Sequence, residues 1–163
     1  MGLIGRVTSW LFSTLAILLA STSAHADVTG YPRVADGDTL VISGERIRLH
    51  GIDSPETRQT CTKDGKACNC GRDATAALVT RIGAQAVTCK GDKRDRYKRL
   101  IAVCFSGQLD LNAWIVRHGW ALAYRKYSRD YAGDERAPMD ERKGIWRGSF
   151  IPPWEWRRQK RGR

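Results

Sequence analysis

Two short acidic segments, Asp36-Gly37-Asp38-Thr39 and Asp53-Ser54-Pro55-Glu56, hold the residues of this chain that are best suited to chemistry. Asp38 begins one strand-like segment, and Asp53 ends the strand-like segment that follows it. If these strands pair around a turn at Ser43-Gly44-Glu45, residues whose numbers sum to about 89 to 91 lie opposite each other. The two aspartates satisfy this relation, so both carboxylates reach one end of the hairpin. Two carboxylates with nearby carbonyl oxygens form a site for a hard cation such as calcium or magnesium.

Residues around this acidic pair extend the chemistry to phosphate. Glu56 follows one step beyond Pro55, where its carboxylate can orient or deprotonate a water molecule. Arg48 lies on the strand that Asp53 ends, and the segment Asp95-Arg96-Tyr97-Lys98-Arg99 adds positive charge at the start of another strand. Arginine forks match the geometry of phosphoryl oxygens. Each motif alone is weak, because Asp-Gly is a common turn and a charged run is usually a solvated face. Together they indicate hydrolysis of a phosphodiester.

The elements that must position these residues are short. Period-two patterns predict five strands, over 34–42, 46–52, 84–89, 97–105 and 120–124. A helix is expected over 72–82, with Ala76, Ala77, Val79 and Ile82 on one side, and a second helix is expected between a cap at Asp110 and a stop at Gly119. A third, weak helix over 128–143 is interrupted by Pro138, and 53–71 reads as a long loop. The pattern predicts a mainly β, α+β domain: a five-stranded OB-type barrel decorated by about three helices.

The first 26 residues have the features of a secretory signal. Arg6 precedes an apolar run that ends near Ala20, and Ala24-His25-Ala26 is a typical cleavage site. The apolar run is about half the length of a membrane span. We therefore expect a signal peptide at 1–26, a single domain at 27–150 and a basic, tryptophan-containing tail at 151–163. The protein would be periplasmic or secreted, monomeric and free of the membrane after cleavage.

Charge and cysteine content are consistent with an exported protein that has an anionic partner. The net charge is +11, from 28 Lys and Arg against 17 Asp and Glu, which suits nucleic acid, an acidic polysaccharide or a membrane surface. Disulfides are expected after export. Cys89 and Cys104 fall in strands that a tight turn brings together, Cys61 and Cys70 could close a small loop, and Cys68 is left over. The spacing does not fix this pairing, and metal binding by Cys68 and Cys70 is the weaker alternative.

The joint order of these motifs resembles the staphylococcal nuclease (thermonuclease) family. The segments that carry the resemblance are VADGDTL at 34–40, IRLHGIDSPET at 47–57, DRYKR at 95–99, LNAWIVRHG at 111–119 and GIW at 144–146. The resemblance implies an OB-fold nuclease that hydrolyses DNA and RNA with Ca²⁺ and leaves 3′-phosphate ends.

The resemblance also implies a role for each matching position. Calcium would be bound by the carboxylates of Asp38 and Asp53 and by the backbone carbonyl of Ser54. The attacking water would be activated by Glu56, and the reacting phosphate would be held by Arg48 and Arg99. The nucleotide would contact Arg96, Tyr97 and Tyr127.

Lys98 departs from the family, which often has glycine at this position. If the backbone there needs a positive φ, lysine strains the turn that aims Arg99.

Two other functions remain open at this stage. A non-catalytic OB module would bind nucleic acid without cutting it, although such modules tend to lose the carboxylates or arginines that are all present here. A binder of acidic exopolysaccharide would also suit an exported, positively charged protein.

Overall fold

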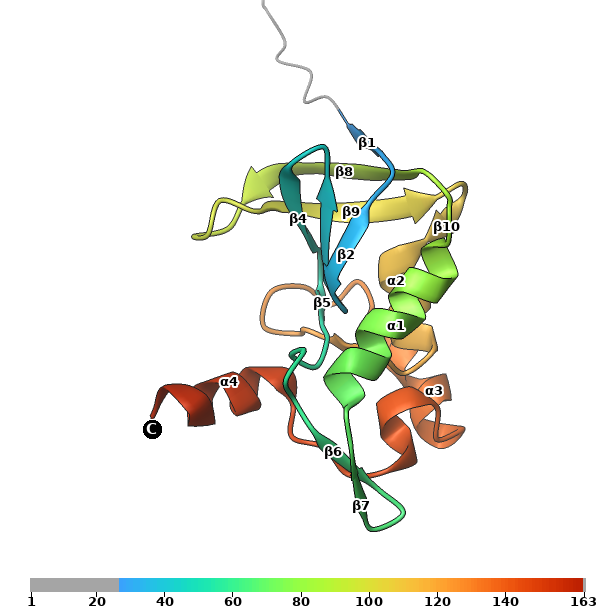
Figure 1. The fold of residues 1–163 in the computed structure, drawn as a ribbon, viewed down its shortest axis with the longest axis vertical. Helices are drawn as coiled ribbons and strands as arrows, with labels where there is room; N and C mark the ends of the chain where they lie inside the picture. Colours follow the sequence, from blue (N-terminus) through green and yellow to red (C-terminus); the bar gives the residue numbers. More distant parts are fainter. Residues whose placement is uncertain (1–26, 163) are drawn as a thin grey trace, which may run out of the picture.

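A computed structural model describes residues 27–162, so the predicted signal peptide lies outside the described residues. One sheet dominates the fold, with strand order β1–β8–β9–β4–β3–β2 and β10 added on β9. Its strands are β1 (Val28–Gly30), β2 (Arg33–Asp36), β3 (Thr39–Ile42), β4 (Glu45–Leu49), β8 (Val87–Arg94), β9 (Leu100–Ser106) and β10 (Leu109–Asp110). All pairs are antiparallel except β4 with β9. Figure 1 shows the helices gathered on one side of this sheet.

The sheet is curled around an apolar core. In β9 every second residue is buried, namely Leu100, Ala102, Cys104 and Ser106. This alternation is the pattern that a strand with one buried face requires. Leu40 and Ile47 pair across β3 and β4 and are fully buried, and burial of such a side chain contributes about 1.5–3 kcal/mol.

Four α-helices lie beside the sheet in the described chain: α1 (Cys70–Ile82), α2 (Leu111–Arg117), α3 (Arg136–Asp140) and α4 (Pro153–Arg161). The predicted cap of α2 is confirmed, because the Asp110 carboxylate accepts a hydrogen bond from Ala113 N at 2.9 Å. Two 3₁₀ helices, η1 (Ala132–Glu135) and η2 (Gly144–Arg147), complete the helical part. The architecture is the predicted α+β, OB-like fold, and the basic tail holds the unpredicted helix α4.

Several local predictions need correction. The segment 53–71 is not a plain loop, because β6 (Cys61–Lys63) and β7 (Lys66–Cys68) form a hairpin in it. The apolar face of α1 is centred on Ala74, Leu78 and Ile82, whereas Val79 is half exposed. The alanine-rich composition hid the four-residue spacing of this face. In the third helical region, Pro138 lies inside α3 rather than breaking it, where its missing N–H falls in the first turn.

The predicted hairpin register was also wrong. Thr39 pairs with Arg48, and Leu49 N donates to Asp38 O at 2.8 Å, so Asp38 lies opposite Leu49 rather than opposite Asp53. The strand ends at this point because Gly51 has a φ of 71°, a conformation that glycine adopts readily. After this turn β5 (Ile52–Asp53) pairs with β11 (Leu122–Ala123) in a separate two-stranded sheet. Asp53 thus approaches Asp38 through a turn instead of through strand pairing.

The disulfides join the expected cysteines. Cys89 and Cys104 are paired across β8 and β9 and bonded, Cys61 is bonded to Cys70, and Cys68 is free. The second of these bonds secures the loop after Asp53 to the start of α1.

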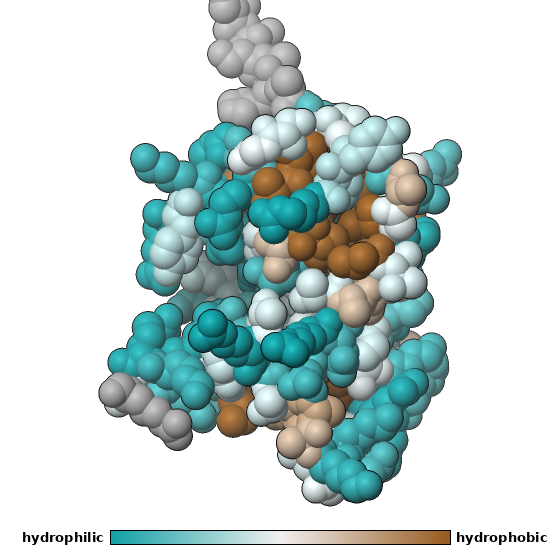
Figure 2. Space-filling view, viewed as in Figure 1, coloured by the Kyte–Doolittle hydropathy of each residue, from teal (hydrophilic) through white to brown (hydrophobic). Residues whose placement is uncertain are grey.

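The described surface is mainly hydrophilic, as Figure 2 shows for one face. Exposed large apolar side chains are few, and Val79 of α1 is one of them. Over residues 27–162, no helix has the length and apolar character that crossing a membrane requires.

We predict that removing the Cys89–Cys104 bond lowers the unfolding free energy much more than replacing Cys68 does. The bond closes a loop of 15 residues in sequence, which corresponds to about 3 kcal/mol in unfolding free energy. Urea denaturation of a Cys89→Ser, Cys104→Ser double variant should show this loss, while Cys68→Ser should stay close to the parent protein. Equal stability of the parent protein with and without reductant would contradict the prediction.

Candidate nuclease site

The turn between β2 and β3 fixes Asp38. Asp36 accepts a hydrogen bond from Asp38 N at 3.0 Å, which shapes the turn. A side-chain carbon on Gly37 would lie 2.1 Å from Ser54 Oγ, so glycine is required for the two acidic segments to touch. Asp38 is buried, and its Oδ2 accepts from Ser54 N at 3.0 Å. The predicted convergence of the two segments is therefore present in the fold.

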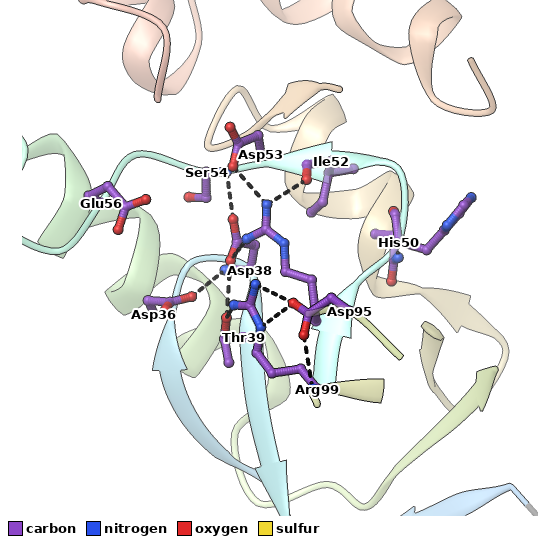
Figure 3. Close-up of polar contacts among 12 residues, drawn as sticks. Asp36, Asp38, Thr39, His50, Ile52, Asp53, Ser54, Glu56, Asp95 and Arg99 are labelled. Atoms are coloured by element: carbon purple, nitrogen blue, oxygen red, sulfur yellow. Dashed lines mark hydrogen bonds and ion pairs between the residues drawn. The ribbon is translucent and has the colours of Figure 1, made fainter. Parts of the chain in front are cut away.

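Arg48 joins the two predicted metal-binding aspartates. Its Nη2 donates to Asp53 Oδ1 at 2.7 Å and to Ile52 O at 3.1 Å, and its Nη1 contacts Asp38 Oδ1. Both carboxylates are almost completely buried. Figure 3 shows Asp38 and Asp53 directed into the same space. One guanidinium from β4 therefore lies between two buried carboxylates and offsets part of their negative charge.

Asp36 is a third acidic group beside this pair. Burial raises the pKa of Asp36 above its ordinary value, although a hydrogen bond with Thr39 and the charges of Arg48 and Arg99 act in the opposite direction. Because its carboxylate accepts a hydrogen bond from Asp38 N, Asp36 stabilises the turn between β2 and β3.

Arg99 reaches the site from the start of β9. Its Nε donates to Asp95 Oδ2 at 2.8 Å, and its Nη1 donates to Thr39 Oγ1 at 3.3 Å, next to Asp38. Lys98 has a φ of 64°, so the positive φ expected at this position is present. Asp95 stabilises this turn, because its carboxylate also accepts a hydrogen bond from Tyr97 N at 2.9 Å. The aim of Arg99 thus depends on Asp95, a positioning residue to which the sequence had assigned no role.

Glu56 is held near the aspartates by its backbone. Gln59 N donates to Glu56 O at 2.7 Å, and the Gln59 side chain accepts from Glu56 N at 3.3 Å. Gln59 is buried and also donates from Nε2 to Ile151 O at 2.6 Å. Its signal in the sequence was weak, because one glutamine in an aperiodic segment resembles any loop residue. The Glu56 side chain is 36% exposed, so water can reach it.

The tail supplies a residue that sequence reasoning missed. Arg157 of α4 donates to both carboxylate oxygens of Asp53, at 3.0 and 2.6 Å, and to Glu56 Oε1 at 2.6 Å. The sequence showed only a basic tail. Pro153 at the first helical position was the available sign of a helix, since proline favours that position.

The predicted nucleotide contacts lie at the surface. Tyr97 and Tyr127 are 61% and 71% exposed. The guanidiniums of Arg96 and Arg99 lie 4.8 and 5.6 Å from the centre of the Tyr97 ring. Tyr127 packs edge-on against Tyr124 at 4.8 Å. Tyr97 therefore presents an exposed aromatic ring with two guanidiniums beside it, and Arg99 links this ring to the acidic pair.

The donor set suits a hard cation. Within residues 27–162, no three His, Cys, Asp or Glu side chains form a ready-made cage for a metal ion. Asp38 and Asp53 are nevertheless adjacent, buried oxygen donors, as calcium and magnesium prefer. The arginines supply the positive charge that such carboxylates need in the folded protein.

Comparison with known proteins agrees with this geometry. The model of the "Staphylococcal nuclease homologue" family matches residues 46–148. An "Uncharacterized endonuclease" of Escherichia coli O157:H7 is 31% identical over 144 residues, covering 83% of this chain and 88% of that protein. The "Succinoglycan biosynthesis protein ExoI" of Rhizobium meliloti is 34% identical over 146 residues, covering 86% and 76%. An "Uncharacterized endonuclease" of Haemophilus influenzae is 27% identical, covering 88% and 80%.

The chain belongs to the staphylococcal nuclease homologue family. Its endonuclease relatives support a nuclease, a hydrolase whose substrate is nucleic acid.

We predict that Asp95→Asn destabilises the protein most at neutral pH. Burial alone would raise the pKa of Asp95, but the hydrogen bonds and charge of Arg99 hold it below its ordinary value. A lowered carboxyl pKa contributes stability above about pH 4 and loses it as the pH falls through the lowered value. The difference in unfolding free energy between parent and variant should therefore narrow below about pH 4. Asp92→Asn, at an exposed position of β8, is the control, and a pH-independent difference would refute the assignment.

Proposed function

We propose that the protein is a calcium-dependent nuclease that hydrolyses DNA, RNA or both and leaves 3′-phosphate ends. The observation that carries the proposal is the convergence of buried Asp38 and Asp53 on Arg48, with Glu56 and Arg99 beside them. This combination supports the proposal, because the cation ligands, the water-activating carboxylate and the phosphate-binding groups that it requires would lie close together.

Asp38 and Asp53 would hold the calcium ion, together with the backbone carbonyl of Ser54. When bound, the ion supplies positive charge to a phosphate oxygen. Their burial favours this role, because a hard cation compensates carboxylates that are cut off from water.

Glu56, Arg48 and Arg99 would carry the remaining chemistry. Glu56 is open to solvent and takes a proton from the attacking water as the water oxygen bonds to phosphorus. The bond from phosphorus to the 5′ oxygen breaks, that oxygen takes up a proton from solvent water as it leaves, and the phosphate stays on the 3′ oxygen of the other fragment. The two arginines donate to the non-bridging oxygens, whose negative charge grows in the transition state.

The surface around the site suits a nucleic acid strand. Arg96, Tyr97 and Tyr127 would contact the nucleotide through cation and ring contacts, which tolerate any base. The net charge of +11 adds attraction for phosphate backbones.

Export is the second part of the proposal. The sequence of residues 1–26 and the two disulfides support a periplasmic or secreted protein. We propose that it acts there as a monomer.

Binding of acidic polysaccharide is a second candidate. It is motivated by the positive charge and by the printed name of the Rhizobium meliloti relative. Binding of a polysaccharide would not require buried carboxylates paired with arginines, so the nuclease function is favoured.

We predict calcium-stimulated cleavage that a chelator abolishes. Single-stranded DNA and RNA should be cut with calcium and left intact in excess chelator, and end-group analysis should find 3′-phosphates. An acidic exopolysaccharide of matched charge is the binding control, measured at several salt concentrations. Undiminished cleavage in chelator would refute the metal requirement, and 5′-phosphate ends would refute the proposed bond.

We predict that Glu56→Gln lowers kcat by about 10²- to 10⁴-fold, the usual contribution of a positioned acid or base. Glu155→Gln is the matched control, because Glu155 belongs to α4 and pairs with Arg158 at 3.8 Å. Circular dichroism of both variants checks that the fold is intact. Full turnover by folded Glu56→Gln would remove this residue from the proposed chemistry.

A further inference from the structure

Helix α4 is anchored to the nuclease domain, although it lies beyond the residues that the family model matches. Trp154 stacks on Tyr124, with ring centres 5.2 Å apart and an interplanar angle of 7°. Pro153 is buried, and Ile151 O accepts from the buried Gln59 side chain at 2.6 Å. Figure 1 shows α4 on the same side of the sheet as the other helices. The first turn of α4 is therefore fixed by packing on the site's own supporting residues.

From this anchored helix, Arg157 reaches the acidic cluster. Its guanidinium holds both oxygens of Asp53, which is completely buried, and one oxygen of Glu56. Burial would lower the pKa of Arg157, but these two carboxylates raise it above its ordinary value. The Arg157 side chain is 28% exposed, so it is partly in contact with solvent.

Two guanidiniums converge on one oxygen. Arg48 Nη2 lies 2.7 Å and Arg157 Nη1 lies 3.0 Å from Asp53 Oδ1. An anionic oxygen that came to this place would receive hydrogen bonds from both arginines, as phosphate does in many arginine clusters.

We propose that Arg157 is an additional active-site arginine that exchanges partners. Without a divalent cation it neutralises Asp53 and Glu56. When a cation takes Asp53, Arg157 gives up that carboxylate and donates to the phosphate of the bound nucleic acid. This inference rests on the proposed nuclease function for its second step, whereas its first step concerns cation binding alone.

The side of α4 that faces the segment after β11 fits the same ligand. A cavity of about 450 Å³ lies between α4 and the segment after β11, lined by Tyr124, Lys126, Trp154, Arg158 and Arg161 among others. Its stacked rings and positive side chains are suited to a base and the neighbouring phosphates. A strand that lies across Arg157 could therefore continue along α4.

The exchange predicts opposite effects of Arg157→Gln on two measurements. Calcium affinity, measured by calorimetry without nucleic acid, should increase at least about fivefold, because the competing guanidinium is gone. At saturating calcium, kcat for single-stranded DNA should fall by about 10²-fold, because one phosphate donor is lost. Arg157→Lys keeps the positive charge but lacks the two-pronged guanidinium. Its calcium affinity and its kcat should lie between those of the parent protein and those of Arg157→Gln.

The matched control is Lys160→Gln, which removes one positive charge from the exposed face of the same helix. It should change neither calcium affinity nor kcat beyond twofold. Unchanged or weaker calcium binding by a folded Arg157→Gln variant would overturn the competition, and unchanged kcat would overturn the phosphate contact. If the parent protein cleaves no nucleic acid, the proposed function fails, yet the calorimetric comparison still decides whether Arg157 competes with the cation.

Discussion

The contact of Arg48 with both Asp38 and Asp53 is the interaction on which the site depends. Two carboxylates buried side by side repel each other and have lost their water, so the fold needs a positive partner between them. Removing one member of such a buried arrangement typically costs about 3–5 kcal/mol. The turn at Gly51 makes this contact possible, because it follows β4 and brings Asp53 back to the Arg48 guanidinium.

The parallel pairing of β4 with β9 brings the second family arginine to the same place. Arg48 pairs with Ile101, so Arg99, two residues before Ile101, enters the sheet at the end of β9 that lies beside β4. Arg99 then lies between Asp95 and Thr39, with Asp95 neutralising it and fixing its direction. The sheet topology thus sets the spacing of the two arginines, and local ion pairs set their orientation.

Much of this site could be inferred from the sequence, because its parts are local. The Asp38 turn, the Asp53 to Glu56 segment and the Asp95 to Arg99 turn are each short motifs with a physical signature. The register of β3 and β4 was misplaced because the connecting turn is the two residues Ser43 and Gly44, both with positive φ, whereas Glu45 already pairs with Ile42. A further turn at Gly51 then ends the hairpin that periodicity had continued to Asp53. Gln59 and Arg157 were also missed, since each acts through a partner distant in sequence: Gln59 contacts Ile151, and Arg157 contacts Asp53.

The number of arginines at the acidic cluster has a consequence for the fold. Asp38, Asp53 and Glu56 contribute three negative charges, and Arg48 and Arg157 contact all three carboxylates. In a site held only by a metal, loss of the metal leaves buried carboxylates unbalanced, and folding then depends on the ion. Here guanidiniums from β4 and α4 offset most of that negative charge within the chain. The acidic cluster is therefore held together by the chain's own arginines.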